Sequence, residues 1–351
     1  MMNKSKTYLW LTIVLMLTLL SLDAAACLTF CLQNGKNIVY GRNFDWNVDV
    51  GAVIVNRRHV RKTAFVLSPE KPVSWVSKYG SVTFNQFSKE VPVGGMNEQG
   101  LVIESLVSET KHPCSDERKT INELQWIQYH LDTCRTVDEV IQSARCVRIS
   151  PYAVKLHYFI SDHSGRSAVI EFIQGKMVHR SAEGLPVKVL ANTSYDRALK
   201  TVMSQRSRFA RAARMIRKYD GRKNAVEYAF GTLDAVAQGD FTKWQVVYDI
   251  PHRRIYFRTL RKRKIKLITL SDFDFEHEKK ALMLDINING EGSMQGQFKI
   301  YTEELNDYLM KASLREFKKA GMMQHIKSAH IEHIRKVVAL CKHEPRRTPT
   351  R

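Results

Sequence analysis

The residue with the clearest chemical potential is Cys27, because the sequence before it resembles a segment that is removed after synthesis. Cleavage in front of Cys27 would leave a thiol and a free α-amine on the same residue. An α-amine has an ordinary pKa of about 8, so it can accept a proton near neutral pH more readily than a lysine can. The amine can then act as general base for its own thiol, directly or through a water. Proteolysis alone would assemble nucleophile and base.

Residues 1–26 have the features of a secretory signal peptide. Two lysines precede an apolar stretch, Tyr8–Leu22, of about 15 residues. That length suits a signal peptide and is short for a membrane span. Ala24 and Ala26 occupy the positions −3 and −1 before Cys27. We therefore expect export, cleavage before Cys27, and a periplasmic or secreted mature protein.

Three other interpretations of this segment stay open. It could remain as an uncleaved N-terminal anchor. Cys27 could carry lipid, although lipoproteins have a large aliphatic residue three positions earlier and this chain has Ala24. Cys27 could also be a structural cysteine close to the cleavage site. The short apolar stretch and Ala24 favour cleavage to a free cysteine.

Arg42 and Asp45 are the charged residues expected beside Cys27. Two predicted strands, residues 28–32 and 38–42, are joined by a turn with an Asn-Gly pair, which is typical of a β-hairpin. A hairpin returns its far end to its start, so both charges would come close to the thiol. An arginine there stabilises a thiolate, and a carboxylate can hold an ammonium group. Alone, Arg-x-x-Asp is a weak pattern, more often a surface ion pair.

The elements that must position these residues are mostly strands. The helical patterns come as two pairs between runs of strands, rather than alternating with them one for one. This grouping favours an α+β protein with antiparallel sheets over a doubly wound parallel fold. The predicted helices are residues 122–131, capped by Thr120, residues 137–144, capped by Thr136, and residues 208–219 and 224–236.

Charge is the unusual part of the composition. The chain has 351 residues, enough for a full core, and a formal net charge of +20. Such a surplus attracts anionic partners, whether membranes, nucleic acid or acidic small molecules, and does not choose among them. In an exported protein we expect no nucleic-acid role. The six cysteines are too sparse for a disulfide scaffold and match no zinc template, and bridges among those other than Cys27 cannot be paired from sequence.

Five motifs follow one another from the new N-terminus onward. After Cys27 they are Gly41-Arg42-Asn43-Phe44-Asp45, Trp75-Val76-Ser77-Lys78-Tyr79-Gly80-Ser81-Val82, Gly95-Met96-Asn97-Glu98-Gln99-Gly100-Leu101, Ala191-Asn192-Thr193-Ser194-Tyr195-Asp196 and Ser207-Arg208-Phe209-Ala210-Arg211. In this order they resemble the choloylglycine hydrolase and penicillin V acylase family of N-terminal-nucleophile hydrolases. Each motif is modest, but five in order are specific, and they extend from Cys27 to about Tyr301.

The resemblance implies a fold and a set of roles. The fold would be an αββα sandwich of two antiparallel sheets between helical layers. Cys27 would be nucleophile and base, with Arg42 and Asp45 tuning and positioning it. Asn192 would donate its amide hydrogens to the oxyanion, and Arg208 would supply charge near the thiolate and amine. No cofactor and no metal are expected.

Two further positions complete the predicted site. Relatives carry an Asn or a Tyr a few residues after the Gly-Met-Asn-Glu motif, as a second oxyanion contributor, and here that position is Val107. Valine offers only its backbone N–H, so nothing about the substrate follows from it. Glu104 and Glu109 could form a carboxylate pair, but Glu104 alternates with apolar neighbours, and we interpret it as part of a solvated face.

Residues 303–351 form a basic, partly helical extension beyond the resemblance, which leaves residues 27–302 as the predicted hydrolase domain. Apolar residues interleaved with the charges give the extension an amphipathic character. The stretch from Lys311 to Arg351 could pack on the body of the protein or on a partner subunit, or bind an anionic membrane or envelope polymer. Metal binding is not expected from its histidines, which are His325, His330, His333 and His343.

Two functions from different classes remain at this point. The first is an exported cysteine amidase that cleaves the linear amide C–N bond of a small N-acylated substrate through an acyl-thioester on Cys27. Conjugated bile salts, penicillin V and N-acyl homoserine lactones are the candidate substrates. The second is a non-enzymatic envelope protein that uses the fold and the basic extension for attachment. The joint presence of Cys27, Arg42, Asp45, Asn192 and Arg208 favours the amidase.

Overall fold

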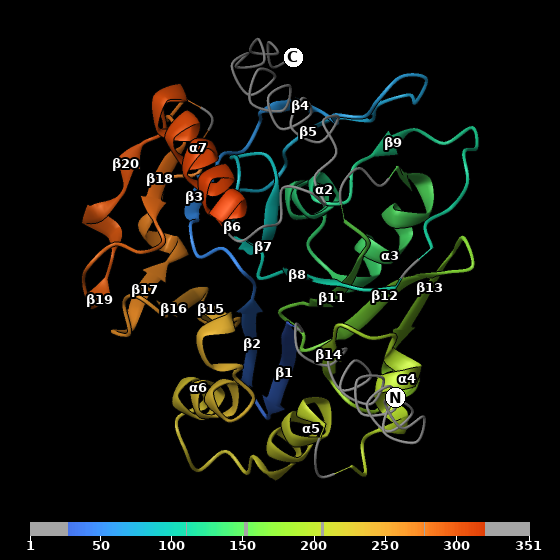
Figure 1. Cartoon of the computed structure of the whole chain (residues 1–351), viewed down its shortest axis with the longest axis vertical. Coiled ribbons are helices and arrows are strands. Elements are labelled where there is room, and N and C mark those ends of the chain that lie inside the picture. Colours follow the sequence, from blue (N-terminus) through green and yellow to red (C-terminus); the bar gives the residue numbers. More distant parts are fainter. Residues whose placement is uncertain (1–26, 110, 151–153, 205–206, 277, 320–351) are drawn as a thin grey trace, which may run out of the picture.

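Two large β-sheets pack face to face in the computed structural model, which describes residues 27–109, 111–150, 154–204, 207–276 and 278–319 (Figure 1). The predicted signal peptide therefore lies outside the described residues. The seven-stranded sheet has the order β14 (Val189–Ala191), β1 (Leu28–Asn34), β2 (Asn37–Asp45), β15 (Thr242–Asp249), β16 (Arg254–Thr259), β17 (Lys266–Thr269) and β19 (Gly292–Ser293).

The nine-stranded sheet is antiparallel throughout, and the seven-stranded sheet is antiparallel except where β17 pairs with β19. The order of the nine-stranded sheet is β13 (Lys176–Ser181), β12 (Ser167–Ile173), β11 (Leu156–Ser161), β8 (Val102–Val107), β7 (Pro92–Asn97), β6 (Ser81–Asn85), β3 (Ala52–Asn56), β18 (Leu282–Asp285) and β20 (Lys299–Ile300). Two small pairs lie outside these sheets: β4 (Arg61–Thr63) with β5 (Ser74–Val76), and β9 (Thr120–Ile121) with β10 (Arg148–Ile149).

Aromatic side chains from both sheets meet in the core between them. The ring centroids of Tyr40 on β2 and Phe159 on β11 lie 5.3 Å apart, and those of Phe84 on β6 and Phe257 on β16 lie 5.7 Å apart. All four residues are at most 1% exposed. Fully burying a side chain of this size stabilises the folded state by about 1.5–3 kcal/mol, so this layer fixes how the two sheets face each other.

Helices cover the outer faces of both sheets (Figure 1). On the seven-stranded sheet they are α5 (Arg208–Lys218) and α6 (Ala225–Ala235), with the short α4 (Tyr195–Lys200) at its β14 edge. On the nine-stranded sheet they are α2 (Gln125–Thr133), α3 (Val137–Cys146) and α7 (Glu303–Lys319). Among the described residues, no helix is both long and apolar enough to cross a membrane.

The β1–β2 hairpin forms as its sequence predicts. Asn34 pairs with Asn37 across the turn, where Gly35 adopts a positive φ of 55° that favours glycine. The same register places Leu28 opposite Asn43, so the far end of β2 returns to the start of β1. The hairpin therefore delivers the end of the Gly-Arg-Asn-Phe-Asp motif to Cys27.

The predicted start of the first helix is wrong. Thr120 lies in β9, and α2 begins at Gln125, where the side chain of Asn122 accepts a hydrogen bond from the backbone N–H of Gln125 at 2.8 Å. Thr120 instead pairs with the chain beside it, so its backbone is used in a ladder. The cap of α3 is as predicted, because Thr136 accepts from the backbone N–H of Glu139.

His130 gives the folded protein a dependence on acid. It is fully buried in α2 against Trp126, and burial lowers its pKa to about 3, whereas an unfolded histidine has a pKa of about 6.5. Between these values the unfolded chain binds a proton that the folded protein excludes. We expect the free energy of unfolding to fall as the pH drops through this window, by up to about 1.4 kcal/mol per pH unit. Chemical denaturation at a series of pH values should show a weaker dependence of the unfolding free energy on pH in His130→Gln than in the wild type.

Helix α7 shows that the described part of the C-terminal extension belongs to the body. Its residue Leu309 packs against Ala52, Ile54 and Met283 on the outer face of the nine-stranded sheet. Further along, the ring of Phe317 lies 6.1 Å from that of Trp46 and 5.1 Å from that of Phe87. Packing on the body is thus what residues 303–319 do, while residues 320–351, with the four histidines, lie outside the described residues.

We expect Phe317→Ala to reduce the free energy of unfolding by about 3 kcal/mol, because Phe317 is 4% exposed and its removal leaves a cavity beside two aromatic rings. Tyr308, on the same helix, is 68% exposed, and Tyr308→Ala should change stability little. Urea unfolding of both variants measures the difference. Equal, small effects would mean that α7 does not contribute to the core.

Candidate active site

Cys27 lies immediately before β1, buried at the end of the hairpin. Its Sγ is 3.8 Å from Nη2 of Arg42 and 3.6 Å from the backbone carbonyl oxygen of Asp45, to which the thiol donates. The structure therefore brings together the thiol and the two charged residues predicted beside it. It does so through strand register, since Thr29 of β1 pairs with Arg42 of β2.

Arg42 is held from the opposite sheet. Its Nη1 forms a buried ion pair with Oε2 of Glu104 on β8 and donates to the carbonyl of Val93 at 3.2 Å. Tyr248 on β15 donates its hydroxyl to the other carboxylate oxygen of Glu104. The expectation that Glu104 belongs to a solvated face is therefore wrong: the residue is 1% exposed and faces the core between the sheets. Glu109, by contrast, is exposed.

Asp45 is held from the helical layer. Its Oδ2 accepts from Nη2 of Arg208, the first residue of α5, at 2.7 Å, and its Oδ1 accepts from the hydroxyl of Thr242 at 2.5 Å. Arg208 also donates from Nε to the carbonyl of Val236 after α6, which fixes its direction. Arg208 thus connects the start of α5 to the carboxylate of Asp45. Thr242 is a site residue that sequence reasoning missed.

Asn192 reaches the site through the edge strand β14. Asn192 directly follows β14, whose last residue Ala191 pairs with Leu28, the residue after Cys27, so the segments that carry Asn192 and Cys27 leave the ladder at the same end. The segment after it is anchored, because the backbone N–H of Tyr195 donates to Oε1 of the buried Glu171 on β12 at 2.9 Å. The role of Asn192 as oxyanion donor stays a prediction from the resemblance.

The electrostatics favour a neutral thiol at rest. Burial raises the pKa of Cys27, and the nearby charge of Arg42 partly opposes that rise. Burial alone would lower the pKa of Arg42, but Glu104 raises it, so the guanidinium stays charged. A base that takes the proton during attack is needed for a thiol in this environment.

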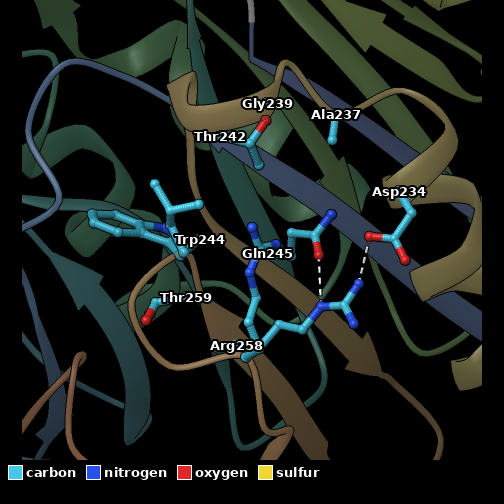
Figure 2. Close-up of a pocket in the computed structure, with 10 residues that line it drawn as sticks. Asp234, Ala237, Gly239, Thr242, Trp244, Gln245, Arg258 and Thr259 are labelled. Carbon is cyan, nitrogen blue, oxygen red and sulfur yellow. Dashed lines mark hydrogen bonds and ion pairs between the residues drawn. The ribbon is translucent and has the colours of Figure 1, made fainter.

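A cavity of about 80 Å³ lies behind Thr242, on the side of α6 (Figure 2). In it, Arg258 donates to Gln245 at 2.7 Å and forms an ion pair with Asp234 at 2.5 Å. Gln245 in turn donates to Oδ1 of Asn43 on β2 at 3.0 Å. These contacts tie β2, β15 and β16 together underneath the strand residues that carry the site.

The structure also locates Val107 and the described cysteines. Val107 ends β8, and its side chain packs with the cluster under α2 and α3. The described cysteines, Cys27, Cys31, Cys114, Cys134 and Cys146, are free thiols. Within the described ranges, no three His, Cys, Asp or Glu side chains gather in the manner of a metal site.

Comparison with solved structures identifies the fold class. A penicillin V acylase from Agrobacterium tumefaciens superposes with a TM-score of 0.69 and 24% identity, over 79% of this chain and 98% of that chain. A mutant of the conjugated bile acid hydrolase from Clostridium perfringens superposes with a TM-score of 0.59 and 16% identity, over 79% and 96% of the two chains. These likenesses confirm the predicted fold, an αββα sandwich of two antiparallel sheets between helical layers.

The family follows from the sequence match. The profile of the linear amide C–N hydrolases, choloylglycine hydrolase family, matches residues 27–203, and the chain belongs to this family. It is also 30% identical over 183 residues to a penicillin V acylase from Pectobacterium atrosepticum. That alignment covers 46% of this chain and 48% of the relative, so the chain matches about half the length of the curated protein.

Proposed function

We propose that this protein is a cysteine amidase that hydrolyses the linear amide C–N bond of a small N-acylated molecule. The observation that carries the proposal is the thiol of Cys27, placed 3.8 Å from Arg42 at the head of a strand in a family of linear amide hydrolases. The pairing of Leu28 with Ala191 supports it, because it brings the segment that carries Asn192 to the same end of the sheet as Cys27.

The reaction begins with a proton transfer within Cys27. In the proposed mature form the α-amine takes the thiol proton, and the thiolate attacks the substrate carbonyl carbon. Arg42 stabilises the thiolate by its charge, and the two carbonyl electrons that move to oxygen are stabilised by hydrogen bonds from Asn192. Asp45, fixed by Arg208 and Thr242, holds the end of β2 against the new N-terminus.

The tetrahedral intermediate then collapses. The C–N bond breaks, the α-ammonium group gives its proton to the leaving amine, and an acyl-thioester remains on Cys27. Water next attacks the thioester carbonyl while the α-amine accepts a proton from it. The C–S bond breaks, and the acid leaves with the thiol regenerated. Proton and charge return to their starting positions after each cycle.

Both the amidase and its substrate class are tested by a panel. Purified protein beginning at Cys27 is incubated with penicillin V, a glycine-conjugated bile salt and an N-acyl homoserine lactone, chosen because each joins an apolar acyl group to an amine by a linear amide. Liquid chromatography should detect the free acid and free amine from at least one. Absence of products from all three, in folded protein with an intact N-terminus, would remove the support for this substrate class.

Maturation is a separate prediction. We propose that the protein is exported and cleaved between Ala26 and Cys27, because the small residues Ala24 and Ala26 occupy the cleavage positions. N-terminal sequencing and intact mass of the exported form should give a free Cys27 amine. A lipid-modified cysteine, or a mature chain that starts elsewhere, would contradict the mechanism, since the α-amine would not be available as base.

A further inference from the structure

Glu104 is a charged residue in an apolar layer. Its neighbours on the same face of β8, Val102 and Leu106, are at most 1% exposed and belong to the core between the sheets, and Glu104 is buried to the same extent. A buried carboxylate is costly unless it is paired and hydrogen-bonded. Here both oxygens are used: Arg42 contacts Oε2, and Tyr248 donates to Oε1.

The contacts of Arg42 explain what this carboxylate does. The guanidinium has two terminal nitrogens in a rigid planar fork, so fixing one nitrogen fixes the direction of the other. Nη1 is fixed by Glu104 and by the carbonyl of Val93. Nη2 is then directed at Sγ of Cys27, 3.8 Å away. The orientation of the Arg42 guanidinium is therefore set by groups on the nine-stranded sheet.

Gly94 makes room for this arrangement. It pairs with Glu104 between β7 and β8, and a Cβ on Gly94 would lie 1.9 Å from Oε2 and 2.1 Å from the carboxyl carbon. Any other residue at Gly94 would displace the carboxylate. Lack of a side chain at position 94 is thus a requirement of the Arg42–Glu104 contact.

We propose that Glu104 is a positioning residue that orients the guanidinium of Arg42 toward Cys27 and balances its charge from the opposite sheet. This inference rests on the proposed function, since it assigns a role within the same site. Glu104 acts through Arg42, because its carboxylate is enclosed by β2, β7, β8 and β15. Arg42 with Glu104 and Arg208 with Asp45 each combine one positive and one negative charge, so neither ion pair adds net charge beside Cys27.

The test measures Cys27 without any substrate, so it can fail independently of the amidase proposal. The rate of Cys27 alkylation by iodoacetamide is followed against pH, with peptide mass spectrometry reading Cys27 alone. The ionisable groups around Cys27 are its own α-amine, Arg42 and Asp45 on β2, Glu104 on β8, Tyr248 on β15, and Arg208 on α5 behind Asp45.

The midpoint of this rate profile is the pH at which alkylation reaches half its maximal rate. Two variants should move the midpoint in opposite directions. Gly94→Ala keeps both charges but displaces the carboxylate, so the Arg42 fork loses its aim and the midpoint rises by about one pH unit. Glu104→Gln keeps an acceptor for Nη1 but removes the charge that offsets Arg42, so the midpoint falls. Gly184→Ala is the control, because no atom lies within 4 Å of the Cβ that it adds.

Turnover gives a second readout. On any substrate that the wild type cleaves, Gly94→Ala should lower kcat about tenfold with KM nearly unchanged, because Glu104 is buried between the sheets and acts through Arg42. A merely structural role predicts lower stability in both variants with the alkylation midpoint unmoved. Midpoints of folded Gly94→Ala and Glu104→Gln that both equal the wild-type value, or that shift in the same direction, would overturn the proposal.

Discussion

Replacing Cys27 with alanine is expected to abolish amide hydrolysis while leaving the fold intact. The side chain is small, and the β1–β2 ladder begins one residue later, at Leu28 with Asn43, so no backbone pairing is lost. Without sulfur no acyl-thioester can form, and residual turnover should be at least about three orders of magnitude below the wild type. Product release on a cleaved substrate and the melting temperature measure the two effects.

Cys27→Ser separates nucleophilicity from shape. Serine keeps the geometry, but its hydroxyl is far harder to ionise than a thiol, so activity should again be lost almost completely. Cys146→Ser is the matched control, because Cys146 is an exposed cysteine in α3, and its activity should equal that of the wild type. Unchanged turnover in Cys27→Ala would refute the assigned nucleophile.

Asn192→Ala is expected to lower kcat by about two to three orders of magnitude, the usual cost of removing one oxyanion donor. KM should change little, because the hydrogen bond strengthens only when the carbonyl oxygen gains charge. The segment that carries Asn192 is held by the pairing of Ala191 with Leu28 and by the backbone N–H of Tyr195, which donates to Glu171. Steady-state kinetics and a thermal melt are sufficient to measure it.

An asparagine-to-alanine substitution far from the site is the control for Asn192→Ala. Asn37 is exposed and begins β2 at the opposite end of the hairpin, so Asn37→Ala should retain full activity. An Asn192→Ala enzyme whose kcat stays within a few-fold of the wild type would show that another donor carries the oxyanion. Iodoacetamide alkylation of Cys27 in Asn192→Ala should remain normal, because the variant leaves Arg42 and the thiol unchanged.

Local sequence signals predicted those site residues that are close to Cys27 along the chain. The Asn-Gly turn fixes the hairpin, and the hairpin alone brings Arg42 and Asp45 to Cys27. Asn192 and Arg208 came from motif resemblance instead. No local pattern says that β14 pairs with β1, or that α5 starts beside Asp45; these contacts depend on how the sheets and helices assemble.

Glu104 could not be assigned from its own segment for a related reason. A carboxylate among apolar strand residues fits a solvated face and a buried ion pair equally well, and its partner Arg42 is 62 residues away on the other sheet. The available signal was that β8 does not alternate between polar and apolar residues. Val102 and Leu106 on one face and Ile103 on the other are all apolar, as expected for a strand buried on both sides. Similarly, the side chain of Asn122, and not that of Thr120, accepts from the first turn of α2, because Thr120 is paired in β9.

The order of strands in the seven-stranded sheet divides the site into two parts that differ in their resistance to local unfolding. Arg42 and Asp45 lie on β2, which is hydrogen-bonded to β1 on one side and β15 on the other, whereas Asn192 follows β14, the edge strand. Fraying β2 requires two ladders to open together, while β14 can detach by releasing one. Amide hydrogens near Asn192 should therefore exchange with solvent sooner than those near Arg42. In the proposed mechanism, the part of the site that receives the carbonyl oxygen is therefore the part that opens more readily.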